Sequence, residues 1–317
     1  MGIRPYGHQS GGGARRDGTL PSAVVRRQKE NEMPRFKKVY LEITNVCNRD
    51  CAFCPKTKRA PRFLPDAEFV RLLDKLRPWT DYLYFHLMGE PLLHPNLGRF
   101  LALAGERGFR VILTTNGTLL DRVGPVLLAA PALHKLNLSL HSFEANGGTE
   151  LEDYVNSCAR FGREAAARGV LVNLRLWNGD SAARTGWNAE NARILELLAR
   201  VFPRPWSPSR TGERLADRVF LDRAEIFDWP DGSAEGENAA HSCYGLRDQI
   251  GVLCDGTVVP CCLDHDGELA LGNLLEEGLG EILERPRAKA ILAGFRRGEA
   301  VEELCKRCGY ASRFRSN

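Results

Sequence analysis

The segment Val39-Tyr40-Leu41-Glu42-Ile43 is followed after three positions by Cys47-Asn48-Arg49-Asp50-Cys51-Ala52-Phe53-Cys54. Its β-branched and aromatic residues predict a strand, so the cysteines begin a loop at the strand's carboxyl end. In an α/β barrel this end of the strands forms the catalytic face. Three cysteines spaced C-x3-C-x2-C can bind three irons of a [4Fe–4S] cluster and leave the fourth iron open for chemistry.

Zinc is the main alternative for these cysteines. Structural zinc uses four ligands, mostly in paired C-x2-C units, so a fourth ligand would have to come from elsewhere. Disulfides fit less well, because 10 cysteines in 317 residues without a secretory signal indicate metal binding in a reducing compartment. The spacing therefore favours iron–sulfur ligation.

The motif of Cys47, Cys51 and Cys54, with Phe53 before the third cysteine, resembles the cluster motif of radical S-adenosylmethionine (SAM) enzymes. The strand-like segment 82–87 ends in Met88-Gly89-Glu90-Pro91, which is similar to the Gly-Gly-Glu-Pro segment that binds the SAM amino group in that family. Methionine replaces the first glycine here. An ordinary strand-to-loop turn is the alternative, but the position one strand and one helix after the cysteines favours a SAM site.

Strand-like and helix-like segments alternate through the first two thirds of the chain. The segments 111–117, 136–141 and 170–176 have the apolar pattern of strands, and 66–76, 97–107 and 188–202 have helical spacing. Alternation predicts an α/β fold with parallel strands and right-handed crossovers. The resemblance implies a partial (β/α)6 barrel with a small C-terminal Fe–S domain containing a β-hairpin.

Polar residues at the predicted strand ends are further candidates. The resemblance implies that Asn116, Ser139 and Arg175 face the ribose or carboxylate of SAM, beside Phe53, Gly89, Glu90 and Pro91. The alternatives are hydrogen bonds to loop backbone for Asn116 and Ser139, and an ion pair with a surface carboxylate for Arg175.

A second cysteine-rich region lies near the C-terminus. Cys243 is followed by twelve residues, Gly256, four residues and Cys261, and later by Cys305-Lys306-Arg307-Cys308. This pattern resembles the twitch domain, the shortened SPASM form, in which four cysteines hold one auxiliary [4Fe–4S] cluster. No cysteine follows Cys308, so we expect one auxiliary cluster rather than two. A four-cysteine zinc knuckle is the alternative.

A β-hairpin is predicted around Asp255-Gly256-Thr257, between apolar segments 250–253 and 258–259. It would bring Cys243 and Cys261 together. Cys262 is the alternative ligand if the hairpin register differs. Cys254 is assigned to no cluster, and Cys158 lies in a helical stretch where a small buried side chain is the usual role.

These segments give four expected regions. Residues 1–34 form a disordered N-terminal extension, 35–205 the barrel, 206–240 a loop-rich bridge, and 241–317 the twitch domain. An upstream start codon at Met1, with translation truly beginning at Met33, is an alternative for the extension.

The formal net charge of +4 comes mostly from residues 1–32, which carry six Lys and Arg and three Asp and Glu. Composition therefore gives no indication of nucleic-acid binding. No segment approaches the roughly 20 apolar residues that cross a bilayer, and we expect a cytoplasmic protein.

The resemblance implies that the open cluster binds SAM and that its reduction generates a 5′-deoxyadenosyl radical, which takes a hydrogen atom from the substrate. The auxiliary cluster would then support a net oxidation, with a flavodoxin- or ferredoxin-type electron donor. A small alcohol or sugar-like substrate is slightly favoured, and maturation of a peptide or protein is the alternative. A non-catalytic Fe–S electron carrier and a zinc-stabilised binding protein are the alternatives from other classes.

Overall fold

A computed structural model describes residues 35–143, 150–181, 185–230 and 239–314 of the chain. The expected extension over 1–34 lies outside these residues, so its disorder stays a prediction. In the described part of the chain, no helix is long and apolar enough to cross a membrane.

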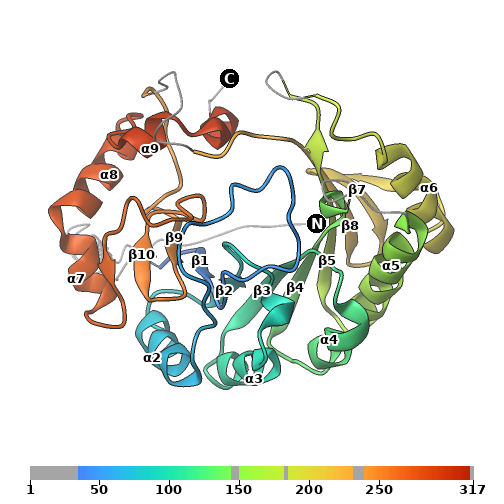
Figure 1. Cartoon of the computed structure of the whole chain (residues 1–317), viewed down its shortest axis with the longest axis horizontal. Coiled ribbons are helices and arrows are strands. Elements are labelled where there is room, and N and C mark those ends of the chain that lie inside the picture. The colour runs from blue at the N-terminus through green and yellow to red at the C-terminus, as the bar shows by residue number, and fades with distance from the viewer. Residues whose placement is uncertain (1–34, 144–149, 182–184, 231–238, 315–317) are drawn as a thin grey trace, which may run out of the picture. The chain divides into compact units, whose positions relative to one another are not determined.

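Six parallel strands form the centre of a curved sheet (Figure 1). In sheet order they are β1 (Lys38–Leu41), β2 (Tyr82–Phe85), β3 (Arg110–Thr115), β4 (Leu133–Ser139), β5 (Leu171–Gly179) and β8 (Val219–Glu225). This topology confirms the predicted α/β class and the partial barrel of six strands.

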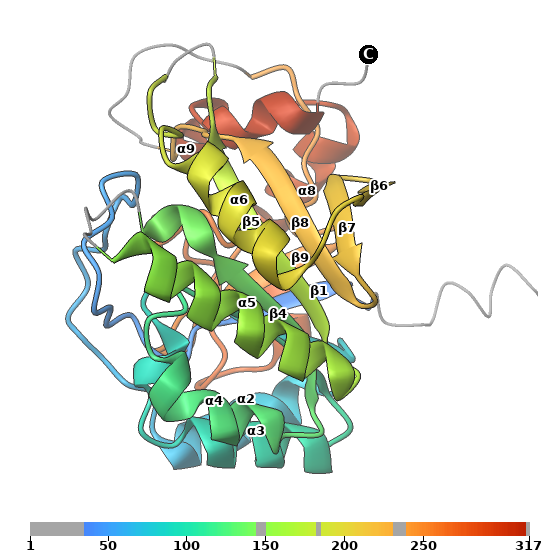
Figure 2. The ribbon, with the colours of Figure 1, turned by 90° about the vertical axis from the view of Figure 1, so that its right-hand side faces the viewer.

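Five helices cover the outer face of these strands (Figure 1 and Figure 2). They are α2 (Asp66–Leu76), α3 (Leu97–Glu106), α4 (Leu120–Leu128), α5 (Leu151–Ala167) and α6 (Asn191–Val201). Short 3-10 turns follow β2 and β4 at η1 (Pro91–Leu93) and η2 (Leu140–Ser142), and η4 (Gly309–Phe314) ends the described chain. The helices predicted over 66–76, 97–107 and 188–202 are therefore confirmed within a few residues.

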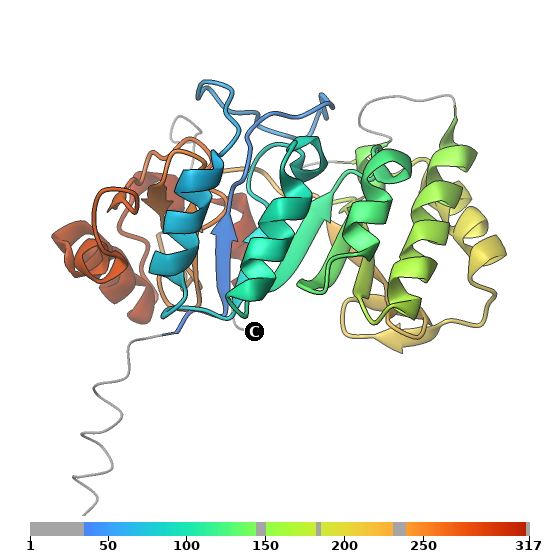
Figure 3. The same ribbon diagram turned by 90° about the horizontal axis from the view of Figure 1, so that it is seen from below.

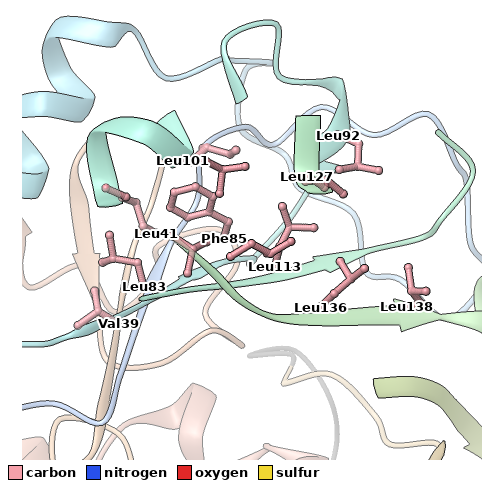
Figure 4. Close-up of a cluster of buried hydrophobic side chains, with 14 of the residues drawn as sticks. Val39, Leu41, Leu83, Phe85, Leu92, Leu101, Leu113, Leu127, Leu136 and Leu138 are labelled. Atoms are coloured by element: carbon pink, nitrogen blue, oxygen red, sulfur yellow. The ribbon is translucent and has the colours of Figure 1, made fainter. Parts of the chain in front are cut away.

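Alternate strand residues point toward the helices and make the main core (Figure 4). Val39, Leu83 and Leu113 are completely buried there, and each such side chain contributes roughly 1.5–3 kcal/mol of burial free energy. The residues between them, such as Tyr40 and Tyr84, therefore face the inner side of the sheet. In a parallel barrel, the active site is built where the inner side meets the carboxyl ends of the strands.

The segment expected as a loop-rich bridge, 206–240, differs in the structure. It contains β6 (Ser207–Ser209), β7 (Gly212–Ala216) and β8, and β8 pairs with β5 as the sixth parallel strand. Val219 and Leu221 are buried on its core face. The strand is stabilised by pairing with β5 and β7, which the local sequence, with its Pro, Gly and Asp residues, does not show.

The C-terminal part continues the same sheet beyond β1. The predicted hairpin is confirmed as β9 (Gln249–Val252) and β10 (Thr257–Val259), and β9 pairs in parallel with β1. The remaining elements are β11 (Gly272–Asn273), α7 (Leu279–Glu284), α8 (Pro286–Arg296) and α9 (Glu303–Lys306). The second cysteine region is thereby attached directly to the strand that leads into the first.

Candidate active site

The loop between β1 and α2 carries the three N-terminal cysteines and lies beyond the carboxyl end of β1 (Figure 3). Asn45 fixes the base of this loop. Its amide nitrogen donates to the Ala60 carbonyl at 2.9 Å, and its oxygen accepts from the Arg62 backbone N–H at 2.7 Å. The two ends of the loop are therefore held together independently of any cluster.

The three thiols of this loop influence one another. Burial raises the pKa of Cys47 and Cys54, the charge of Cys51 raises the pKa of Cys47 further, and Cys47 does the same to Cys54. Lys56 opposes this by lowering the pKa of both thiols, and its Nζ donates to the Cys51 carbonyl at 2.9 Å. Three thiols in one loop, with a lysine that favours the ionised form of Cys47 and Cys54, fit an iron–sulfur cluster.

The Gly89-Glu90-Pro91 turn packs directly against the residues that precede Cys47. Gly89 has φ +74°, and an added Cβ would lie 2.4 Å from the Thr44 carbonyl oxygen and 2.8 Å from the Val46 carbonyl oxygen. The Glu90 backbone N–H donates to the same Val46 carbonyl at 2.8 Å. Glycine is therefore required at this position by both backbone conformation and space.

Gly89→Ala is expected to destabilise the fold by about 2–4 kcal/mol, because it combines a left-handed backbone with overpacking against fixed carbonyls. Thermal unfolding and iron content after reconstitution would measure the effect. Gly169→Ala is the matched control: its φ is +90°, but nothing lies within 4 Å of an added Cβ. Equal midpoints for the two variants would show that the close approach to Thr44 has no energetic importance.

The Glu90 carboxylate joins the end of β2 to the end of β3. It accepts hydrogen bonds from the Leu92 backbone N–H (3.0 Å), the Thr115 hydroxyl (2.7 Å) and the Asn116 backbone N–H (2.8 Å). It is almost fully buried, and this burial raises the pKa of Glu90 to about 7. A carboxylate has about four acceptor positions, so one remains for a further donor. Pro91 follows as the first residue of η1 and is buried.

The strand-end candidates have different surroundings. Asn116 is held in place, since its amide donates to Asn48 (3.0 Å) and its oxygen accepts from the Thr118 hydroxyl (2.7 Å). Ser139 contributes its carbonyl oxygen, which accepts from the Ser142 hydroxyl at 2.7 Å. Asn116 is thus brought to the cysteine loop through Asn48.

Phe53 is paired with His141, which the sequence did not identify as a site residue. Their ring centroids are 5.1 Å apart. Burial lowers the pKa of His141 to about 4, and its Nδ1 lies 3.1 Å from the Arg175 carbonyl oxygen. The two ring planes are tilted by 43° to one another, so a neutral imidazole and a phenyl ring offer two adjoining apolar faces next to the cysteine loop. Thr115 was also missed, because a strand-end threonine carries no signal by itself.

The four C-terminal cysteines form a second group. Burial raises the pKa of Cys261 strongly, and Cys243, Cys305 and Cys308 each raise it further through their charge. Burial, with the charges of Cys243 and Cys308, likewise raises the pKa of Cys305. Four thiols that repel one another when ionised need a cation to hold them together, so this donor set fits a cluster with four thiolate ligands.

The neighbours of Cys261 and Cys262 indicate which of the two is the fourth ligand of the second cysteine group. Cys262 hydrogen-bonds with Tyr40, whose pKa is raised by burial first and then by Cys262. Cys262 thus lies toward the inner face of the sheet. Cys261 interacts with all three other cysteines of the group, whereas Cys262 interacts with Cys243 and Cys308, which favours Cys261 as the fourth ligand.

Single-ion sites are a separate matter. Over the described ranges, no three His, Cys, Asp or Glu side chains are close enough to hold one metal ion.

Cys158 is buried in α5, as expected for a packing residue, and burial raises its pKa to about 12.

A buried ion pair connects the two cysteine regions. Glu42, fully buried at the end of β1, accepts from both terminal nitrogens of Arg59 at 2.7 and 2.8 Å. The same carboxylate accepts from the backbone N–H groups of Met88 (3.2 Å) and Cys254 (3.0 Å). One carboxylate therefore joins β1, the Gly-Glu-Pro turn, the cysteine loop and the C-terminal hairpin.

Asp266 makes a second connection between these regions. Its Oδ1 accepts from the Thr57 hydroxyl at 2.5 Å and from the Lys58 backbone N–H at 3.0 Å. Arg59 also donates through Nε to the His265 carbonyl at 2.9 Å. The loop that carries the first three cysteines is thus held by the domain that carries the other four.

Comparisons with known proteins agree with this geometry. Residues 41–169 match the radical SAM superfamily, and residues 243–309 match SPASM, an iron-sulfur cluster-binding domain. The chain is 22% identical over 285 residues to the S-adenosyl-L-methionine-dependent 2-deoxy-scyllo-inosamine dehydrogenase of Niallia circulans, covering 87% of this chain and 94% of the relative. It is 27% identical to the PqqA peptide cyclase of Xanthomonas euvesicatoria pv. vesicatoria (strain 85-10), covering 85% of this chain and 79% of the relative.

Among solved structures, BtrN in complex with AdoMet and 2-DOIA is similar, with a TM-score of 0.52 and 19% identity over 86% of this chain and 92% of BtrN. This similarity supports the fold. The chain belongs to the radical SAM superfamily and carries a C-terminal domain of the SPASM or twitch type. Its cofactors are SAM and [4Fe–4S] clusters, and it is a radical SAM enzyme.

Proposed function

We propose that the enzyme catalyses a net oxidation of its substrate, with Cys47, Cys51 and Cys54 holding the SAM-binding cluster and Cys243, Cys261, Cys305 and Cys308 holding one auxiliary cluster. When bound, the first cluster and SAM supply a carbon radical that removes a hydrogen atom from the substrate. The observation that supports this most is the joining of the two cysteine regions through Glu42 and Arg59.

The chain's own residues prepare the SAM site. Glu90, which accepts three hydrogen bonds from the protein, would hold the SAM ammonium with its remaining acceptor position, and the paired rings of Phe53 and His141 would flank the adenine. Gly89 lets this turn approach the backbone before Cys47, so a cofactor held by Glu90 would lie close to the cysteine loop. Asn116 completes the site on the ribose side, through its contact with Asn48.

The substrate is proposed to be a small hydroxylated molecule, because the relative with the most complete mutual coverage among those described is a dehydrogenase of a sugar-like compound. Peptide maturation is the second candidate, supported by the similarity to a peptide cyclase over 85% of this chain. We further propose a cytoplasmic setting, which agrees with the cysteine usage, and a flavodoxin- or ferredoxin-type electron donor.

Anaerobic reconstitution with iron, sulfide, dithionite and SAM tests this function. Formation of 5′-deoxyadenosine identifies the radical enzyme, whereas a simple electron carrier or a zinc protein forms none. A candidate substrate with deuterium on the carbon that bears its hydroxyl should transfer deuterium into 5′-deoxyadenosine. Transfer from a peptide instead would establish the second candidate.

Glu90→Ala is expected to raise the SAM concentration needed for half-maximal cleavage by roughly 10- to 150-fold, because a charge-assisted hydrogen bond in a buried site is lost. Since the pKa of Glu90 is about 7, above its ordinary value of 4.5, SAM binding to the wild type should strengthen as pH rises from 6 to 8. Because the pKa of Glu90 is higher in the folded protein than its ordinary value, the free energy of unfolding should fall as pH rises from 4.5 to 7. Bound SAM offsets this loss of stability.

Titration of SAM at several pH values, with iron content measured in parallel, would check both the loss of SAM affinity in Glu90→Ala and the pH dependence of SAM binding to the wild type. The variant should lose the pH dependence together with the affinity. Glu68→Ala is the control, because that carboxylate pairs with Arg62 at 2.6 Å on the outer side of the cysteine loop. An unchanged SAM titration in Glu90→Ala would make the Gly-Glu-Pro segment a structural turn alone.

A further inference from the structure

Arg175 is an incompletely paired cation on the inner face of the sheet. Its Nε is buried and has no hydrogen-bond partner among the described residues. Its guanidinium lies over the Trp177 ring at 4.4 Å from the centroid, and burial is the largest cause of its lowered pKa. A buried donor without a partner costs about 1–3 kcal/mol, and more when the group is charged, so such a residue indicates a ligand.

In the described part of the chain, Asn137 carries a buried hydrogen-bond acceptor without a partner, whereas Arg175 carries a buried donor without one. Its amide nitrogen donates to the Thr114 hydroxyl at 3.1 Å, but its buried Oδ1 has no partner within the described ranges. Asn137 pairs in register with Asn173, and Ser139, two residues further along β4, pairs with Arg175. Adjacent strands therefore present a free donor and a free acceptor on the same face of the sheet.

The charges around Arg175 are unbalanced. Lys135, also on the inner face of β4, has its pKa lowered by burial first and then by the charge of Arg175. Asp222 is the anion that both cations feel, but its oxygens already accept hydrogen bonds from Asn173 (2.7 Å) and from Thr211. Two desolvated cations thus share one carboxylate that is occupied by other donors.

Hydroxyl groups surround the same region. The phenols of Tyr40, Tyr84 and Tyr310 are all close enough to interact with Arg175, and the rings of Tyr40 and Tyr84 are 5.1 Å apart. Phenols donate to anionic oxygens, and a planar guanidinium matches a carboxylate or phosphate with two parallel hydrogen bonds.

We propose that the inner face of the sheet binds a substrate bearing a carboxylate or phosphate group, with Arg175 and Lys135 as the residues that hold this group and Asn137 Oδ1 accepting from a hydroxyl of the same molecule. The proposal rests on the proposed function, since it names the substrate class of that site. It also replaces the expectation that Arg175 binds SAM. Arg175 interacts with Tyr40 of β1, Tyr84 of β2, Asp222 of β8 and Tyr310 of η4. The Glu90 carboxylate has other partners, at the ends of β2 and β3.

Calorimetric titration of the anaerobic, fully reconstituted enzyme with inorganic phosphate, and separately with malonate, tests this site. The wild type should bind at least one of them saturably, and Arg175→Met should bind it about 10- to 100-fold more weakly. Tighter binding of phosphate indicates a phosphorylated substrate, and tighter binding of malonate indicates a carboxylic acid. Arg107→Met is the matched control, because Arg107 pairs with Asp74 at 2.7 Å on the helical side, and it should bind as the wild type does.

Three results would overturn the proposal: no saturable binding of either anion, wild-type binding by Arg175→Met, or a loss of SAM affinity in Arg175→Met with anion binding retained. If Arg175→Met does not incorporate iron, Lys135→Met replaces it, with anion binding expected to be about 3- to 10-fold weaker; unchanged binding contradicts the proposal. Anion binding needs no SAM cleavage, so failure to form 5′-deoxyadenosine would count against the proposed function alone.

Discussion

Replacing Cys47, Cys51 and Cys54 together with alanine is expected to abolish formation of 5′-deoxyadenosine. The three thiols are the donors in the loop after β1, and without thiolate ligands no open cluster can assemble. Iron content should fall from about eight to about four per chain, the difference of one cubane cluster. Iron and sulfide analysis, Mössbauer spectroscopy and product chromatography would measure both effects.

Cys158→Ala is the control for this variant, because it removes a buried thiol from α5 that belongs to neither cysteine group. It should retain about eight irons and normal SAM cleavage. Normal 5′-deoxyadenosine formation by the triple variant would contradict the central assignment. A loss of all eight irons would instead show that the two clusters assemble cooperatively, in line with the contacts of Arg59 and Asp266 across the two regions.

Local pattern was enough to predict most of the fold. The strands β1 to β5 are rich in apolar residues, the helices α2, α3 and α6 have an apolar face, and the structure contains all of them. The sixth strand, β8, was missed because its apolar run, Val219 to Leu221, is only three residues long and its stability comes from pairing with β5. Pairing between segments more than 40 residues apart is not visible in a single sequence.

In the candidate site, as in the fold, local signals were visible in the sequence and contacts between distant segments were not. Cysteine spacing and the Gly-Glu-Pro turn are local signals, and the structure places Gly89 against the residues before Cys47. Glu42 appeared in the sequence as one polar residue of a strand, but it is the acceptor that joins Arg59, Met88 and Cys254. No sequence rule predicts that contact, since its partners come from three separate loops.

Cys305→Ala combined with Cys308→Ala is expected to preserve SAM cleavage while abolishing oxidation of the true substrate. The four C-terminal thiols lie close enough to influence one another, and losing two of these four ligands removes the auxiliary cluster and about four irons per chain. Without that cluster, the electron left after hydrogen-atom removal has no acceptor. Comparing 5′-deoxyadenosine with oxidised product would show turnover uncoupled by at least about tenfold.

The outcome for this double variant also depends on whether the C-terminal domain still holds the loop of the first three cysteines. The loop of the first three cysteines is held by Asp266 and by the His265 carbonyl, so a C-terminal domain loosened by metal loss could also slow SAM cleavage. Asp266→Asn separates the two effects, because it weakens the contact with Thr57 and Lys58 and leaves every cysteine in place. Circular dichroism and iron content must accompany both variants.

Four outcomes then have different meanings. Normal cleavage with no oxidation in the double variant establishes the redox role of the auxiliary cluster. Slow cleavage in both the double variant and Asp266→Asn shows that the domain acts by holding the cysteine loop, because the second variant retains both clusters. Slow cleavage in the double variant alone places the auxiliary cluster on the electron route to the first cluster. Full oxidation by a folded double variant with about four irons would exclude any obligatory redox role.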